Sequence, residues 1–137
     1  MEESVNDLKR KAAQKGTLAL AYLGDSVIEL LVRERLVNEG LSHPGDLVKA
    51  SKSFVTLEAQ SDAVERILPL LSDEETAVYK RGRNVKTHSV PKHGEVVQYR
   101  RATALETLFG YLHTAGLESR KRELFDAAFP TSVDSEE

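Results

Sequence analysis

The stretch Leu20-Ala21-Tyr22-Leu23-Gly24-Asp25-Ser26-Val27 lies inside the run from Thr17 to Asn38, whose apolar spacing predicts one long helix. Two apolar rows lie almost opposite each other on this helix. They consist of Leu20, Leu23, Val27, Leu30 and Leu31 on one side, and of Leu18, Ala21, Ile28, Val32 and Leu36 on the other. A helix that is apolar on two sides is normally buried on two sides, so we expect it to lie at the centre of the fold.

Asp25 lies within the second of these rows. An ionised carboxylate in a buried helix is costly unless a cation, hydrogen bonds or a metal compensates its charge. We therefore expect another part of the chain to supply a partner. Tyr22 is expected to pack in the core.

Glu106 is a second acid among apolar neighbours, in a predicted helix from Glu95 to Thr114. Small residues lie one turn away, at Ala102, Thr103 and Gly110, and they would allow another helix to approach closely. If the two most apolar helices pack together, Asp25 and Glu106 face each other, and their charges repel unless one is protonated or a cation lies between them. Oxygen ligands favour Mg²⁺ or Mn²⁺. Ordinary solvent-exposed or hydrogen-bonded acids remain the alternative.

The rest of the chain also has helical spacing, and no segment alternates like a strand, so the fold class predicted is all-α with five to seven helices. Residues 1–16 form a lead-in, residues 17–129 a single domain, and residues 130–137 an acidic tail. The first expected helix is 17–38, capped by Thr17 and ending near Gly40, and residues 46–71 form one helix or two broken near Ser51 to Ser53. A further helix, 72–83, begins at Ser72-Asp73-Glu74-Glu75. The last two are 95–114, ending at Gly116, and 117–129. Residues 84–94 form a loop.

The composition narrows the class of protein. The chain has 137 residues, of which 40% are hydrophobic and 30% charged, and it has no cysteine, which excludes disulfides and thiolate metal sites. No apolar run approaches the ~20 residues of a membrane helix. The charged N-terminus does not resemble a secretory signal. We expect a cytoplasmic protein that does not enter a membrane.

Basic charge is concentrated in one segment, although the net charge of the chain is −3. Residues 79–101 contain seven basic residues and one acid, a net +6, so the remainder carries −9. The basic residues are Lys80, Arg81, Arg83, Lys86, Lys92, Arg100 and Arg101. Such a segment in an otherwise acidic chain indicates an anionic ligand, with a solvated basic loop as the alternative.

Several of these motifs together resemble the ribonuclease III family. The stretch from Leu20 to Val27 is similar to its first motif, an aromatic followed by Leu-Gly-Asp, and Glu106-Thr107-Leu108-Phe109-Gly110 is similar to its second. The segments Tyr79-Lys80-Arg81-Gly82-Arg83-Asn84, Ser89-Val90-Pro91-Lys92 and Tyr99-Arg100-Arg101-Ala102-Thr103-Ala104-Leu105-Glu106 resemble the Mini-ribonuclease III group in order and spacing. The likeness covers about residues 16–129.

The resemblance implies a helical endonuclease domain that acts as a homodimer on double-stranded RNA, in maturation of 23S ribosomal RNA precursor. A ribosomal protein on the substrate is a further expected partner. The resemblance also implies that Asp25 and Glu106 are the catalytic residues and the ligands of Mg²⁺, with Mn²⁺ as a substitute, and that cleavage leaves 5′-phosphate and 3′-hydroxyl ends. The residues expected to bind RNA are Arg81, Arg83, Asn84, Lys86 and Lys92.

The sequence departs from the family pattern at two positions. Ala21 and Thr103 stand where full-length ribonuclease III has carboxylates. Those enzymes also carry a separate RNA-binding domain, which we do not expect in this protein, so RNA binding is expected to come from the catalytic dimer itself. The Mini group is expected to share these differences. Loss of carboxylates is also how a non-catalytic double-stranded-RNA-binding module would look, and a helical adaptor that binds only protein is a third hypothesis.

Overall fold

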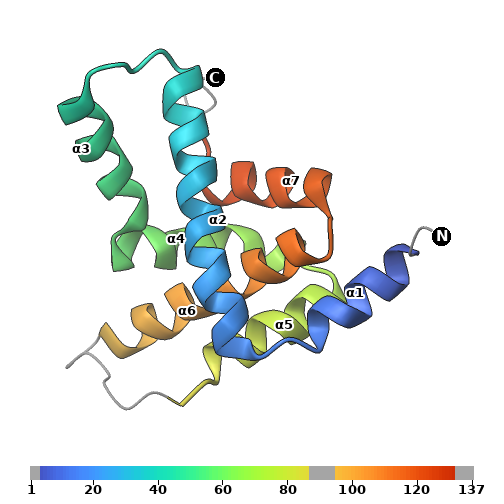
Figure 1. The fold of residues 1–137 in the computed structure, drawn as a ribbon. Helices are drawn as coiled ribbons and strands as arrows, with labels where there is room; N and C mark the ends of the chain where they lie inside the picture. The colour runs from blue at the N-terminus through green and yellow to red at the C-terminus, as the bar shows by residue number, and fades with distance from the viewer. Residues whose placement is uncertain (1–3, 87–94, 132–137) are drawn as a thin grey trace.

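The computed structural model describes residues 4–86 and 95–131, and these form seven α-helices and one short 3₁₀-helix (Figure 1). In chain order they are α1 (Val5–Ala13), α2 (Thr17–Asn38), α3 (Pro44–Val55), α4 (Leu57–Ile67), η1 (Leu68–Leu70), α5 (Asp73–Arg83), α6 (Glu95–Thr114) and α7 (Glu118–Ala128). No strand occurs within the described ranges, so the all-α prediction is confirmed. No helix in these ranges is long and apolar enough to cross a bilayer.

Helix α6 is the centre of the core. It contacts α1, α2, α4, α5 and α7, and Figure 1 shows it crossing α2 with α5 alongside. Its Leu105, Leu108, Phe109 and Leu112 are completely buried. Because each fully buried side chain of this kind stabilises the fold by about 1.5–3 kcal/mol, this helix is the main source of cohesion.

Several predicted helix ends are confirmed. Gly40 and Gly116 follow α2 and α6 with positive φ angles of 96° and 72°, the left-handed conformation that glycine adopts most easily. At the start of α5, the Ser72 hydroxyl accepts a hydrogen bond from the Glu75 backbone N–H at 3.2 Å. The Glu75 carboxylate in turn accepts from the Ser72 N–H at 2.8 Å, which completes a capping box.

Other helix boundaries differ from the sequence predictions. The cap of α2 is Gly16, and Thr17 is the first helical residue, because the Thr17 hydroxyl accepts hydrogen bonds from Arg81 instead. The break between α3 and α4 falls at Thr56, later than predicted, because the Thr56 hydroxyl caps α4 through the Ala59 N–H at 3.1 Å. Most of the predicted loop 84–94 and tail 130–137 lie outside the described residues.

The two apolar rows predicted for α2 are not both buried. The buried residues form one broad stripe that takes members of both rows, among them Leu20, Ile28 and Val32. Leu18 and Tyr22 are 59% and 85% exposed, so the prediction of a core Tyr22 is wrong. Asp25 is also exposed. The physical reason is that no helix within the described ranges covers this face of α2, although its apolar residues satisfy the helical period.

Candidate active site

Two glycines let the backbones of α2 and α6 touch. A Cβ built on Gly24 would lie 1.7 Å from the Glu106 carbonyl oxygen, and a Cβ built on Gly110 would lie 2.0 Å from the Leu20 carbonyl oxygen. Side chains essentially never approach backbone atoms so closely. Glycine at both positions is therefore a steric requirement of this crossing.

The crossing brings Asp25 and Glu106 together, although they are 81 positions apart in the sequence. Asp25 follows Gly24, and Glu106 is the residue whose backbone Gly24 contacts. Their carboxyl groups are within hydrogen-bonding reach, and together with burial this contact raises the pKa of Glu106 to about 7. The largest cause is burial, followed by the charge of Asp25 and the hydrogen bond between the two groups.

The pair has the character of an incomplete cation site. Within the described residues, no lysine or arginine pairs with either carboxylate. Two adjacent carboxylates without a positive partner provide the hard oxygen ligands and negative charge that Mg²⁺ binds. The described residues contain no group of three or more His, Cys, Asp or Glu that would form a denser site. The donor set thus fits an ion that keeps several water ligands.

Ala21 and Thr103 contribute no carboxylate to this site. Ala21 is buried. The Thr103 hydroxyl donates a hydrogen bond to the Tyr99 carbonyl at 3.1 Å, one turn back on α6. Glu29, one turn beyond Asp25, pairs with Arg33.

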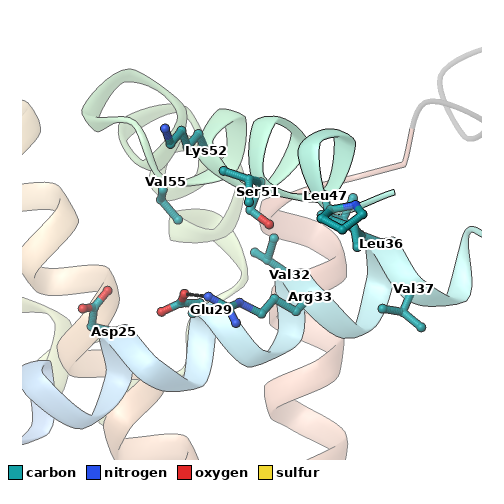
Figure 2. A pocket seen from close by; sticks show the side chains of 12 residues that line it. Asp25, Glu29, Val32, Arg33, Leu36, Val37, Leu47, Ser51, Lys52 and Val55 are labelled. Atoms are coloured by element: carbon teal, nitrogen blue, oxygen red, sulfur yellow. Dashed lines mark hydrogen bonds and ion pairs between the residues drawn. The ribbon is translucent and has the colours of Figure 1, made fainter. Parts of the chain in front are cut away.

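A groove of about 550 Å³ runs between α2 and α3 and has Asp25 at one end. Figure 2 shows the acidic residues Asp25 and Glu29 on α2, with Ser51 and Lys52 on the facing helix. The remaining lining is mostly apolar, and includes Val32, Leu36, Leu47 and Val55. Helical periodicity does not predict this groove, because it does not reveal how far apart two helices lie.

Arg81, on α5, donates hydrogen bonds to the connection between α1 and α2. Its Nη1 donates to the Ala13 carbonyl at 2.7 Å and its Nη2 to the Lys15 carbonyl at 2.8 Å. The Thr17 hydroxyl accepts from Nε at 3.2 Å and from Nη2 at 3.0 Å. The sequence gives no signal of this arrangement, since a basic residue beside other basic residues looks like part of a ligand-binding cluster.

The remaining predicted RNA-binding residues follow α5. Residues 83–86, which we call the cationic segment, contain Arg83, Asn84 and Lys86. The Arg83 Nε donates to the Asn84 side-chain oxygen at 3.1 Å, and Lys86 is exposed. Lys92 lies outside the described residues. Of the other basic residues in the run, Arg101 pairs with Glu65 at 2.7 Å and Arg100 is exposed.

A family model described as the ribonuclease III domain matches residues 18–116 of the chain. Two curated relatives are each called Mini-ribonuclease 3. The protein from Brevibacillus brevis is 40% identical over 90% of this chain and 92% of its own length. The protein from Enterococcus faecalis is 39% identical over 85% and 90%, respectively.

A solved structure has the same arrangement of helices. This crystal structure of a protein from Fusobacterium nucleatum superposes with a TM-score of 0.72 and 31% sequence identity. The match covers 82% of this chain and 90% of that one. The arrangement of helices is therefore shared with a protein of known structure.

Proposed function

The chain belongs to the ribonuclease III family and is an endoribonuclease of double-stranded RNA, and on this premise we propose that Asp25 and Glu106 hold the Mg²⁺ ion on which cleavage depends. Its role is that of the Mini-ribonuclease III group, maturation of 23S ribosomal RNA precursor. The observation that carries the proposal for the site is the glycine-mediated crossing that makes Asp25 and Glu106 neighbours.

The carboxylates suit a metal ligand role because their charge is uncompensated. Enzymes of this family are typically Mg²⁺-dependent, and we propose Mn²⁺ as a working substitute, since it also prefers oxygen ligands. A bound ion supplies Lewis-acid chemistry, polarising the phosphate and lowering the pKa of bound water. Asp25 and Glu106 would be the protein ligands of such an ion, and with only two carboxylates the remaining ligands would have to come from water and substrate phosphate.

Protonation of Glu106 opposes this role. The raised pKa of about 7 means that the carboxyl group holds a proton below neutrality when no cation is bound. Metal binding requires the ionised form, so metal and proton compete for this group. Cleavage of the phosphodiester by water then leaves 5′-phosphate and 3′-hydroxyl ends.

We propose that the cationic segment contacts the RNA backbone, through Arg83, Asn84 and Lys86, with Lys92 as a further contact. Double-stranded RNA is recognised largely through its shape, phosphates and 2′-hydroxyls, which cations and amides can contact. Binding by cations displaces counterions, so affinity should fall steeply as salt rises. Arg81 is not among these contacts, because its guanidinium already donates hydrogen bonds to Ala13, Lys15 and Thr17.

We also propose a two-fold symmetric homodimer. Leu18, Tyr22, Asp25 and Glu29 follow one another at helical spacing on α2. The first two of these are largely exposed apolar residues, which are candidates for burial against a second copy. A two-fold axis would give each RNA strand its own carboxylate pair. A ribosomal protein on the precursor would be an additional partner, and ribosomal RNA as substrate favours the cytoplasm.

The proposal for the metal site is tested with duplex RNA and the variants Asp25→Asn and Glu106→Gln. Each substitution keeps the size of the side chain and removes a charged ligand, so we expect cleavage in Mg²⁺ to fall at least about 100-fold. Duplex binding measured without metal should persist. Asp62→Asn, an exposed aspartate on α4, is the matched control and should cut like the parent.

Two results would count against the site. Parental cleavage by both variants would exclude these carboxylates as ligands. Binding without cleavage by the parent in Mg²⁺ and Mn²⁺ would instead favour the non-catalytic RNA-binding module.

A further inference from the structure

We propose that Arg81 is a positioning residue, which fastens the end of α5 to the start of α2 and so fixes the cationic segment relative to Asp25 and Glu106. The inference rests on the proposed RNA-cleaving function and deepens it. It assigns Arg81 a task different from the phosphate contact that its place in a basic cluster predicts.

The first support is the set of acceptors around the guanidinium. Ala13 is the last residue of α1, and Lys15 and Thr17 belong to the short connection and first turn of α2. Carbonyl groups at a helix C-terminus have no partner within their helix, and a cation there is favourable. One side chain from α5 thus holds the junction of α1 and α2 through four hydrogen bonds.

The second support is the next residue, Gly82, which packs the same turn of α5 against α6. A Cβ at this position would lie 2.5 Å from the Thr107 hydroxyl and 2.8 Å from the Ala104 Cα. Thr107 is fully buried and directly follows Glu106. Arg81 and Gly82 therefore connect the end of α5 to both helices that carry the carboxylate pair.

The third support is that few hydrogen-bond donors of Arg81 remain free to contact RNA. A guanidinium has five N–H donors, and four of the five are engaged in these bonds. Arg81 is half-buried, whereas the following Lys86 is exposed. The cationic segment begins two residues after Arg81, so a shift of this turn would move every proposed phosphate contact.

The test compares Arg81→Lys with Thr17→Ala. Lysine keeps the charge but has its donors on one atom, so it cannot serve three separated acceptors. Thr17→Ala changes no charge and removes the hydroxyl that accepts two of the four bonds. We expect each variant, folded by circular dichroism and assayed well below its melting temperature, to weaken duplex binding and raise KM about five- to tenfold. The double variant should be no worse than the more impaired single variant, because both remove the same connection.

Salt dependence separates positioning from contact. Loss of one phosphate contact lowers the slope of log Kd against log salt by about 0.9 on a duplex. We expect this reduction for Arg83→Gln and an unchanged slope for Thr17→Ala, Arg81→Lys and Arg81→Gln. Arg122→Gln, an exposed arginine on α7, controls for loss of charge and should bind and cut like the parent.

Three results would overturn the inference. Parental binding by Arg81→Lys, together with a reduced slope for Arg81→Gln, would make Arg81 a phosphate contact. Lower melting temperatures with parental KM and Kd would make the connection structural only. If the parent protein fails to cut duplex RNA in Mg²⁺, the proposed function fails and the positioning role fails with it. If the parent protein does cut, the results with the variants test the role of Arg81 alone.

Discussion

Helix α2 meets α6 and α3 in opposite ways. Against α6, its backbone lies so close at Gly24 and Gly110 that no side chain fits between the helices. Against α3, it leaves a groove of about 550 Å³, and α3 has no buried residue. The carboxylate pair lies at the tight crossing, where backbone contact holds its geometry. The loose side leaves room for adjustment, because little apolar surface is committed there.

The largest effect should come from filling the tight crossing. Gly24→Ala or Gly110→Ala places a methyl group on a backbone carbonyl, so the helices must separate or the helix must distort. We expect a loss of unfolding free energy at or beyond the usual overpacking range of about 1–3 kcal/mol, and loss of cleavage. Urea denaturation measures the free energy of unfolding, and an assay with duplex RNA measures cleavage. The control is Gly45→Ala on α3, where an added Cβ meets nothing within 4 Å, and little change is expected.

The next effect concerns pH and the charge at the same crossing. Because the pKa of Glu106 is raised from 4.5 to about 7, the folded state binds more protons than the unfolded state between these values. The contribution of Glu106 to stability without metal should therefore be greatest at low pH and should fall as pH rises through this window, by up to about 3 kcal/mol. Glu106→Gln should flatten that dependence. Denaturation in EDTA at pH 5 and pH 7.5 checks it, and an unchanged difference in the variant would refute the assignment.

A smaller effect is expected on the loose side. Leu47 on α3 is only partly buried against the core, so Leu47→Ala should cost less than the 2–5 kcal/mol of a core leucine. Leu108→Ala on α6, completely buried, is the comparison and should reach that range. Equal losses measured by urea denaturation would mean that α3 is packed as firmly as α6.

The smallest effect should come from the exposed face of α3. Val48 is 54% exposed, so Val48→Ser should change the free energy of unfolding by no more than about 0.5 kcal/mol. Amide hydrogen exchange should be faster in α3 than in α6 in the parent and in the variant alike. Slow exchange throughout α3 would contradict the contrast between the two sides.

Much of the fold follows from local sequence features. The bounds of α2 and α6, the capping box at Ser72 and the glycines after two helices are set by helical period and terminal chemistry. These signals act within a few residues. The same reasoning singled out Asp25 and Glu106, since an acid among apolar residues is conspicuous in any helix.

The other features of the fold depend on contacts between distant parts of the chain, which the helical spacing of apolar residues does not encode. Leu18 fits an apolar row equally well whether or not a neighbour covers it, and only the structure reveals its 59% exposure. Thr17 looks like a helix cap, but its hydroxyl binds Arg81, which is 64 positions away. The position of a helix break was missed by a few residues because Thr56 caps the following helix.

The direct backbone contact between α2 and α6 has a consequence for protein engineering. The separation of the two acids is set by main-chain atoms, so the interior leucines of α6 can be replaced by other apolar residues of similar volume without moving the acids. A thermostable variant built by such redesign should retain the arrangement of the two acids, provided that neither glycine is changed. The scaffold and its chemistry can then be optimised independently.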